Sequence, residues 1–332
     1  MAERNIIVIG CSVGGVEALQ QIVAGLPGNF HASIFVVLHL APQSKSVLPE
    51  ILSRAGSLRA AHAVDGEAIQ PARIYVAPPD YHLLLDRDKV KVVRGPKENR
   101  HRPAIDPLFR SAARWFGSRV IGVILTGALN DGTAGLLSIK KNGGLTVVED
   151  PAESLCSDMP RSAIDNVEVD YVVPVREIPR VLQELAPQQV GGNGAGARSR
   201  TAKETKIAEI DMDAVEDENR PGTPSSFSCP ECGGVLWELV GEEMLRFRCR
   251  VGHAYTAESL STEQTEVVEG AMWAAMRALE EGASLSRRMS QKAEKRGQSG
   301  VARRFAESAE GKMEQADILR KLILEGKEAP VE

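Results

Sequence analysis

Short apolar runs alternate with amphipathic stretches along residues 1–187 of the chain. The apolar runs predict strands at 5–10, 33–40, 72–79, 119–127, 145–150 and 169–175, with a hairpin at 82–95. Apolar residues at helical spacing predict helices at 16–26, 47–55, 106–117, 132–143 and 177–186. Because the strand runs are apolar throughout and alternate with helices, we expect an α/β fold: a doubly wound, mostly parallel sheet with helices on both faces.

The composition changes after residue 187. Residues 188–226 are glycine-rich, then acidic and rich in turn formers, which predicts a flexible linker. Residues 227–262 hold three clustered cysteines, and 263–328 have a helical pattern that predicts an antiparallel hairpin or coiled coil. The apolar positions of that pattern are Val268, Met272, Ala275 and Leu279, then Val301, Phe305, Ala309, Met313, Ala316 and Leu319.

Length, composition and charge narrow the function classes. A chain of 332 residues with 43% hydrophobic content is long enough for one sizeable domain plus a smaller one. The net charge of −5 argues against a nucleic-acid partner, because such proteins present a basic surface. No apolar stretch approaches the roughly 18 residues of a membrane span, and the N-terminus does not resemble a signal peptide. We therefore expect a cytoplasmic protein with no membrane insertion.

The first predicted strand ends in IGCSVGG, residues 9–15. Gly10, Ser12 and Gly14 satisfy G-x-S-x-G, a strand–turn–helix arrangement that exposes a nucleophilic hydroxyl. Two other interpretations remain open for this motif. Ser12 is also a favoured helix N-cap, and the segment resembles a phosphate-binding G-x-G-x-x-G whose middle glycine is replaced.

Two more polar residues follow strand ends. His39 closes the second strand run, where a dinucleotide-binding unit would place an acidic residue for the ribose, and it supplies a general base. Asp131 lies in a glycine-flanked loop after the fourth predicted strand, where a carboxylate can orient the histidine. Taken singly, His39 is typical of a buried core histidine and Asp131 of a helix cap or turn. Together with Ser12 they predict a catalytic triad at one edge of the sheet.

Several motifs in register carry a resemblance over residues 1–187. They are IGCSVGGVEAL, VVLHL, IYVAPPDYHLLL, HRPAIDPLFRSAA, GVILTGALNDGTAGL and MPRSAI. This part of the chain resembles the catalytic domain of the CheB family of chemotaxis protein-glutamate methylesterases. The resemblance implies Ser12 as nucleophile, His39 as base, Asp131 as orienting group, and backbone N–H groups of Val13 and Ala128 as the oxyanion site. The sequence departs from the family at Val13 (usually threonine), Ala128 (usually methionine) and Leu129 (usually glycine).

The resemblance also implies a reaction and a substrate. A serine hydrolase of this family removes methyl esters from glutamate side chains of chemoreceptor coiled coils, releases methanol, and deamidates some glutamines. It needs no cofactor for catalysis, and Arg102, Asp106 and Arg161 lie in family-like motifs that are expected to shape the substrate groove. The sequence starts at the catalytic strand, so we expect no gating by an attached receiver domain. A non-catalytic interaction module and a nucleotide-binding protein are the alternative hypotheses.

The cysteine cluster forms a separate motif. Cys229 and Cys232 give C-x2-C, and Cys249 and His253 give C-x3-H, with sixteen residues between Cys232 and Cys249. These spacings predict a structural zinc site in a small zinc-ribbon-like hairpin. Reduced thiols in a short hairpin are the alternative. Arg246, Arg248 and Arg250 alternate along the segment, which predicts one solvated strand face. The C-terminal helices are expected to support self-association, and the tail as a whole is expected to gate or target the site.

Overall fold

A computed structural model describes residues 2–191, 222–239 and 244–325. The chain divides into two compact units, with the boundary between Leu260 and Ser261. Most of the predicted linker, 188–226, lies outside the described residues. Among those described, no helix is both long and apolar enough to cross a membrane.

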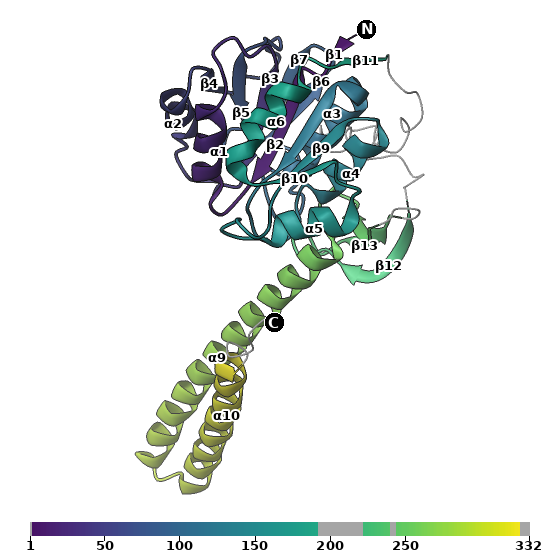
Figure 1. Cartoon of the computed structure of the whole chain (residues 1–332). Coiled ribbons are helices and arrows are strands. Elements are labelled where there is room, and N and C mark those ends of the chain that lie inside the picture. Colours follow the sequence, from purple (N-terminus) through teal and green to yellow (C-terminus); the bar gives the residue numbers. More distant parts are fainter. Residues whose placement is uncertain (1, 192–221, 240–243, 326–332) are drawn as a thin grey trace. The chain divides into compact units, whose positions relative to one another are not determined.

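Seven parallel strands form the central sheet of the first unit, in the order β10-β9-β8-β2-β3-β5-β4 (Figure 1). Their bounds are β2 Ile6–Cys11, β3 Ser33–Leu38, β4 Arg59–His62, β5 Arg73–Val76, β8 Val120–Ile124, β9 Leu145–Glu149 and β10 Tyr171–Val173. The predicted parallel α/β sheet is confirmed. The chain runs from β2 to β3, then to β4 at the edge and back to β5 between them, and afterwards crosses to β8, β9 and β10 on the other side of β2. The order of the strands therefore reverses between β2 and β8, where sheets of this class place their sites.

Alternate side chains of β2 face opposite sides of the sheet, and both sides are buried. Ile7 and Ile9 belong to the cluster that includes α1 Gly15–Ala24, α2 Leu48–Ala55 and α6 Ile178–Leu185. Ile6 and Val8 belong to a second cluster with α3 Ile105–Phe116, α4 Thr133–Lys141 and α5 Asp158–Asn166. Each fully buried isoleucine contributes about 1.5–3 kcal/mol relative to an exposed one. This burial on both faces explains the apolar strand runs of the sequence.

Two elements of the α/β part, β4 and α5, were not predicted from the hydrophobic pattern of the sequence. β4 is a four-residue edge strand, and α5 is short and buries only Met159, Pro160 and Ala163. The predicted hairpin is present as β6 His82–Asp86 and β7 Lys89–Val93, which pair antiparallel. A further pair, β1 Ala2–Glu3 with β11 Gln189–Val190, joins the two ends of the α/β part of the chain.

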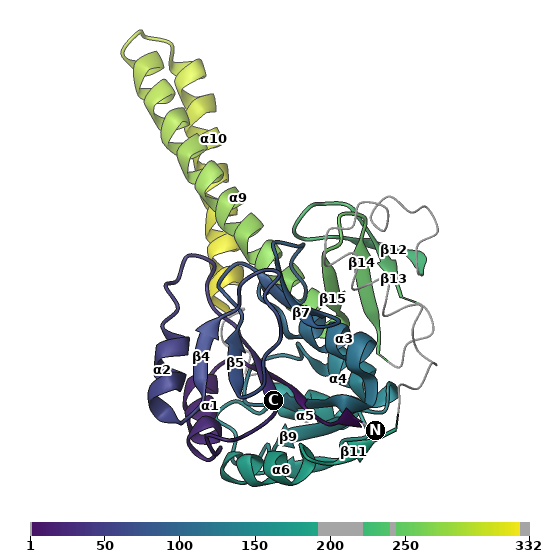
Figure 2. The same ribbon diagram turned by 90° about the horizontal axis from the view of Figure 1, so that it is seen from above.

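The clustered cysteines lie in a second sheet, which we call the ribbon. It consists of β12 Thr223–Ser228, β13 Val235–Glu238, β14 Arg246–Cys249 and β15 Ala254–Thr256, paired antiparallel in this order (Figure 2). Its own core is small: Leu236, Phe247, Tyr255 and Leu260 with Cys229 and Cys249. The ribbon lies in the same compact unit as the parallel sheet. A core of this size favours stabilisation by a metal.

The solvated face predicted for the alternating arginines is wrong for Arg246 and Arg248, whereas Arg250 is exposed. Arg246 and Arg248 are only 5% and 4% exposed. Arg248 donates to the carboxylate of Glu98, which also accepts two hydrogen bonds from Arg110 of α3. The buried Glu98 carboxylate supplies the compensating charge that allows Arg248 to leave water.

The predicted helical hairpin is formed by α9 Ala257–Glu294 and α10 Ser299–Glu325, and all of it from Ser261 onward belongs to the second unit. Its helices are antiparallel, because Ser290 donates to Ala302 and Arg320 pairs with Glu280. Every seventh residue of α10 is buried: Ala302, Ala309, Ala316 and Ile323. The apolar positions predicted for α10 were therefore partly wrong. Val301, one of these positions, is 43% exposed, and the adjacent Ala302 faces α9. Alanine in these positions lets two helices approach closely.

Candidate active site

Ser12 occupies the turn between β2 and α1. Its N–H donates to Thr126 O at 2.9 Å, and Gly15 N–H donates to Ser12 O at 2.9 Å. Gly14 has φ of 78°, a backbone conformation that residues with a Cβ rarely adopt, so the turn favours glycine for its conformation. The turn leaves Ser12 half-buried at the N-terminal end of α1. This end of a helix carries a positive partial charge.

His39 directly follows β3. Its N–H donates to Cys11 O at 3.2 Å, so the parallel ladder places the histidine beside the Ser12 turn. Its Nε2 lies 2.8 Å from Asp131 Oδ2. Its Nδ1 is buried and has no hydrogen-bond partner within the described part of the chain. If Nε2–H donates to the carboxylate, Nδ1 carries the lone pair and is the atom that can accept a proton.

The Asp131 carboxylate accepts four hydrogen bonds. His39 Nε2 and Ile105 N–H donate to Oδ2 at 2.8 and 2.6 Å. Asn99 Nδ2 and Asp106 N–H donate to Oδ1 at 2.9 and 3.3 Å. The two N–H groups belong to the first turn of α3, so Asp131 caps this helix from a distant part of the chain.

These contacts set the charge of Asp131. Burial alone raises the pKa of this carboxyl, but the hydrogen bond and positive charge of His39 outweigh burial and hold the pKa well below its ordinary value. Asp131 is therefore ionised at neutral pH. An ionised carboxylate at this position fixes the histidine tautomer and stabilises an imidazolium.

A second carboxyl group, that of Asp106, shares the Asn99 amide with Asp131. Asn99 Nδ2 also donates to Asp106 Oδ2 at 3.0 Å, and Gly135 N–H donates to Asp106 Oδ1 at 2.6 Å. Complete burial and the negative charge of Asp131 raise the pKa of Asp106 to about 7. The amide of Asn99 thus bridges two carboxyl groups whose pKa values are shifted in opposite directions.

His101 covers one face of the His39 ring. The two rings stack with centroids 3.6 Å apart and planes 9° from parallel. Burial and the neighbouring His39 lower the pKa of His101 to about 3, so it stays neutral at physiological pH. A neutral stacked ring keeps water from this side of His39 without competing for its proton.

The loop after β8 lies against the serine turn. Thr126 Oγ1 donates to Val13 O at 2.9 Å, and a Cβ on Gly127 would lie 2.8 Å from Ser12 Cβ. In the part of the chain that the structure describes, neither Val13 N–H nor Ala128 N–H has a protein acceptor. Leu129 adopts φ of 61°, which is the conformation that glycine favours. Leu129 therefore holds this turn at a cost in strain.

The three expected groove residues lie in different settings. Arg102 donates twice to Asp80 Oδ1 and once to Gly95 O, at 2.6 to 2.9 Å. Arg161 is exposed on α5, and its Nε donates to Ser157 Oγ at 3.1 Å. Asp106 is fully buried beside Asp131. The substrate groove itself stays a prediction.

Sequence reasoning missed Asn99, His101 and the capping role of the α3 N–H groups. The only signal was the polar segment KENRHRP, residues 97–103, placed between the hairpin and α3. Its contacts with Asp131 and His39 span 32 and 62 residues of sequence, so spacing alone does not reveal them.

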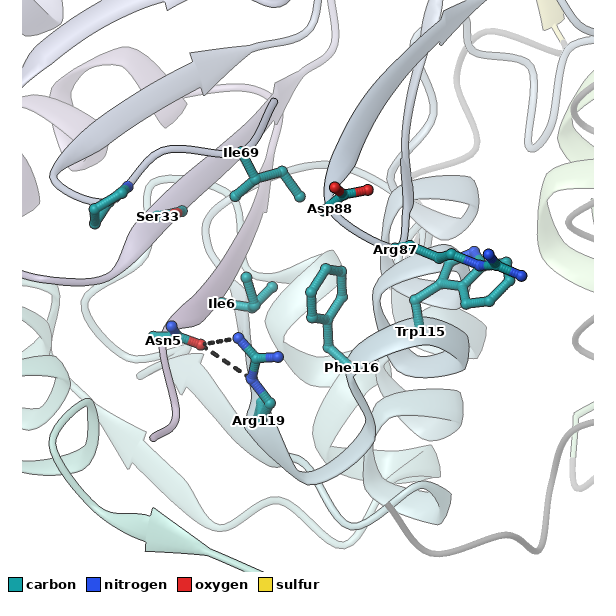
Figure 3. Close-up of a pocket in the computed structure, with 10 residues that line it drawn as sticks. Asn5, Ile6, Ser33, Ile69, Arg87, Asp88, Trp115, Phe116 and Arg119 are labelled. Atoms are coloured by element: carbon teal, nitrogen blue, oxygen red, sulfur yellow. Dashed lines mark hydrogen bonds between the residues drawn. The ribbon is translucent and has the colours of Figure 1, made fainter. Parts of the chain in front are cut away.

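A cavity of ≈ 470 Å³ lies at the opposite edge of the sheet (Figure 3). Ile6 and Ser33, the first residues of β2 and β3, line it, and Arg119 donates to Asn5 at its rim. None of Ser12, His39 and Asp131 belongs to its lining.

The predicted metal ligands come together in the ribbon. The ligand atoms of Cys229, Cys232, Cys249 and His253 all lie within 4.8 Å of one another. Cys232 and Cys249 Sγ are 3.7 Å apart, and His253 Nδ1 lies 3.5 Å from Cys249 Sγ and 3.7 Å from Cys229 Sγ. Around a tetrahedral zinc with bonds of about 2.3 Å to sulfur and about 2.0 Å to nitrogen, ligand atoms stand about 3.5–3.8 Å apart. The donor set and its spacing fit this ion.

Comparison with known proteins points to one family. Residues 7–182 match the family model described as CheB methylesterase. A Leptospira interrogans protein, named as a candidate protein-glutamate methylesterase/protein-glutamine glutaminase, is 42% identical over 180 residues, which cover 54% of this chain and 93% of that protein.

Two Thermotoga maritima proteins are also similar to this chain. One, named protein-glutamate methylesterase/protein-glutamine glutaminase, is 40% identical over 185 residues, and the chain spans only 54% of its length. The other is the crystal structure of a CheB methylesterase catalytic domain, with 38% identity and a TM-score of 0.53, covering 56% of this chain and all of that domain. The ribbon and the helical hairpin lie outside the residues of the family model.

Proposed function

The chain belongs to the CheB methylesterase family, and from this premise we propose that Ser12, His39 and Asp131 form a triad that hydrolyses glutamyl methyl esters on proteins. The observation that carries the proposal is the hydrogen bond between His39 Nε2 and Asp131 Oδ2 beside the Ser12 turn. The buried Nδ1 of His39 supports it, because this atom has no partner among the described residues and is free to act as a base.

The reaction proceeds by acyl transfer. His39 Nδ1 takes the proton of Ser12 Oγ as the oxygen attacks the carbonyl carbon of the ester. The carbonyl oxygen becomes an oxyanion that accepts hydrogen bonds from the N–H groups of Val13 and Ala128. The tetrahedral intermediate collapses, and His39 returns the proton to the departing methoxide, which leaves as methanol. Asp131 stays ionised and stabilises the imidazolium in between.

Water completes the cycle. His39 takes a proton from the water as it attacks the acyl-enzyme, and then returns the proton to Ser12 Oγ, so that a glutamate carboxylate and free enzyme remain. A glutamine side chain can enter the same path with ammonia as leaving group. The names of the relatives, which include both methylesterase and glutaminase, support this second activity.

The proposed substrate is a methylated chemoreceptor, bound along its cytoplasmic coiled coil. Exposed Arg161 and the half-buried Arg102 are the proposed groove residues; the buried Asp106 acts through Asp131. The proposed location is the cytoplasm, where reduced thiols keep the cysteine cluster available for a metal.

The test is methanol release from glutamate-methylated chemoreceptor membranes. The proposal expects release by the wild type and none above background by Ser12→Ala, with Ser308→Ala, an exposed serine on α10, as the matched control. A fluorophosphonate probe is expected to label the wild type and not Ser12→Ala. Absence of both release and labelling in folded wild type would refute the triad and favour a non-catalytic binding module.

We also propose that the cysteine cluster binds one structural zinc ion. Its support is the match between the ligand spacings and tetrahedral geometry described above. Cys229, Cys232, Cys249 and His253 would fill all four positions, which leaves none for a substrate, and the ion would join β12, β13 and β14 at one end of the ribbon. Metal analysis of protein purified without chelators is expected to find one zinc per chain, and Cys232→Ser to lower this content. Zinc-free wild type with a folded ribbon would refute the assignment.

Self-association through the helical hairpin is a further proposal. Leu285 of α9 and Ile318 and Leu322 of α10 are 61%, 59% and 51% exposed, and a second hairpin can bury such apolar side chains. Sedimentation of the full chain is expected to show a dimer or larger species, and Leu285→Glu with Ile318→Glu a monomer. A monomeric wild type at micromolar concentration would contradict the proposal.

A further inference from the structure

The residues that hold Asp131 are themselves held by the ribbon. Asn99 belongs to a tight turn, residues 98–101, which we call the Asn99 turn. Asn99 and Arg100 have φ of 48° and 73°, and the backbones of Glu98 and His101 exchange hydrogen bonds of 3.2 and 2.9 Å. The Asn99 turn presents one side chain to Asp131 and stacks His101 on His39. The orientation of this turn therefore affects both members of the histidine–carboxylate pair.

Strand β15 fixes the backbone of the Asn99 turn. Asn99 N–H donates to Ala254 O at 2.8 Å, and Ala254 N–H donates to Lys97 O at 3.3 Å. Residue 254 directly follows the metal ligand His253, and the backbone of His253 accepts from Cys249 N–H at 2.9 Å. The β14–β15 turn that contributes two metal ligands thus continues into the strand that holds the Asn99 turn.

The hydroxyl groups of Ser259 and Thr256 contact Asn99 and Asn130, the two asparagines that adjoin Asp131. Ser259 Oγ lies 3.3 Å from Asn99 Oδ1, and Thr256 N–H donates to the same oxygen at 3.1 Å. Thr256 Oγ1 donates to Asn130 Oδ1 at 2.8 Å. Asn130 is the residue before Asp131, while Asn99 bonds to its carboxylate. Thr256, Ser259, Asn99 and Asn130 are all less than 5% exposed.

Charged groups also hold this part of the chain against the Asn99 turn and against Asn130. Glu98, the first residue of the Asn99 turn, is 1% exposed and lies between Arg110 of α3 and Arg248 of β14. On the other side, Asn130 Nδ2 donates to Glu258 Oε2 at 2.7 Å. Buried polar networks of this kind hold one geometry, because any rearrangement leaves polar groups without partners.

We propose that Thr256 and Ser259 are positioning residues that hold Asp131 for its bond to His39, so that hydrolysis depends on the docked ribbon. The proposal rests on the function proposed for Ser12, His39 and Asp131. Its physical basis is that a released Asn99 amide leaves Asp131 Oδ1 short of a donor and frees the carboxylate to turn away from His39. Such a change slows proton transfer while leaving the substrate-binding surface unaltered.

The experiment compares Thr256→Val and Ser259→Ala with the wild type. Thr256→Ser keeps the hydroxyl and serves as the rescue variant, and Thr223→Val, an exposed threonine on β12, is the matched control. We measure kcat and KM for methanol release from methylated receptor membranes. Independently, NMR measures the resonance of the proton between His39 Nε2 and Asp131 in the full chain.

Thr256→Val and Ser259→Ala are each expected to lower kcat about tenfold, since the first removes the buried hydrogen bond to Asn130 and the second the one to Asn99, together with the bonds between residues 256 and 259. KM is expected to stay within about twofold, and the His39 resonance to shift or broaden, as it reports the bond itself. Thr256→Ser is expected to recover most of kcat, and Thr223→Val to behave as wild type. Ser259→Ala removes a single atom, so it remains informative if the valine variant is unstable.

Wild-type kcat and an unchanged His39 resonance in both folded variants would overturn the inference. The proposed function would still stand, provided that wild-type release depends on Ser12. If the wild type releases no methanol, the proposed function fails, and the His39 resonance alone then decides whether the ribbon positions the pair.

Discussion

Replacing Asp131 by asparagine tests the centre of the site, because the two side chains have the same shape but different hydrogen-bonding groups. Each carboxylate oxygen of Asp131 accepts two hydrogen bonds. Asparagine has one oxygen and one NH2 group. Whichever way its amide is turned, the NH2 faces two donors, either His39 and Ile105 or Asn99 and Asp106.

Asp131→Asn is expected to lower both the free energy of unfolding and kcat. Two buried donors lose their acceptor at about 1–3 kcal/mol each, so the free energy of unfolding is expected to fall by about 2–6 kcal/mol. The negative charge that we propose stabilises the His39 imidazolium and fixes its tautomer is also lost. Loss of the orienting carboxylate in serine hydrolases of this type lowers kcat by about 10⁴-fold, and we expect a loss of about 10³- to 10⁴-fold.

The assay is methanol release at a temperature where circular dichroism shows the variant folded, together with urea unfolding. Asp165→Asn, an exposed aspartate on α5, is the matched control and is expected to match the wild type in both measurements. An Asp131→Asn enzyme that keeps kcat within tenfold of the wild type would refute the assignment of Asp131 as the orienting group.

Three further predictions concern other parts of the site. Gly127→Ala is expected to lower kcat at least tenfold because the new Cβ displaces Ser12, while Gly300→Ala, with open space around it, keeps wild-type kcat. At Leu129 the glycine variant is expected to be more stable than the alanine variant by about 1 kcal/mol, since φ of 61° penalises every residue with a Cβ; equal urea midpoints would contradict this. Burial raises the pKa of Asp106 from an ordinary 3.8 to about 7, so the folded state binds this proton more tightly than the unfolded state does. The resulting stabilisation is complete below about pH 4 and is lost as the pH rises to about 7. Asp106→Asn is therefore expected to make the urea midpoint depend less on pH between 4 and 7, and an unchanged dependence would argue against this titration.

The strand ends could be predicted because their signals are local. Ser12, His39 and Asp131 each follow an apolar run, and carboxyl ends of parallel strands meet at one edge of a sheet. The structure confirms that His39 and Asp131 meet there, 2.8 Å apart. The cluster of Cys229, Cys232, Cys249 and His253 could be predicted for the same reason, since C-x2-C and C-x3-H are spacings along one short segment.

The stripe of α10 was only partly predictable. Helical spacing indicates the hairpin, but several faces of this helix carry apolar residues, and the spacing does not distinguish Val301 from the adjacent Ala302, which is the buried one. Which face is buried depends on how closely α9 approaches. Hydrophobicity favours the larger side chain, whereas close helix packing selects the smaller one.

The sequence by itself determined the sheet, the three strand-end residues and the spacing of the cysteines and His253, because periodicity and short motifs encode them. Only the tertiary structure decided what surrounds Asp131. The N–H groups of α3 that cap it, the Asn99 amide and the hydroxyls of Thr256 and Ser259 come from segments separated by up to 160 residues. It also decided that Arg248 is buried against Glu98 and not solvated. Such contacts depend on which surfaces the fold brings together, and a buried polar group finds its partner in space whatever its distance along the chain.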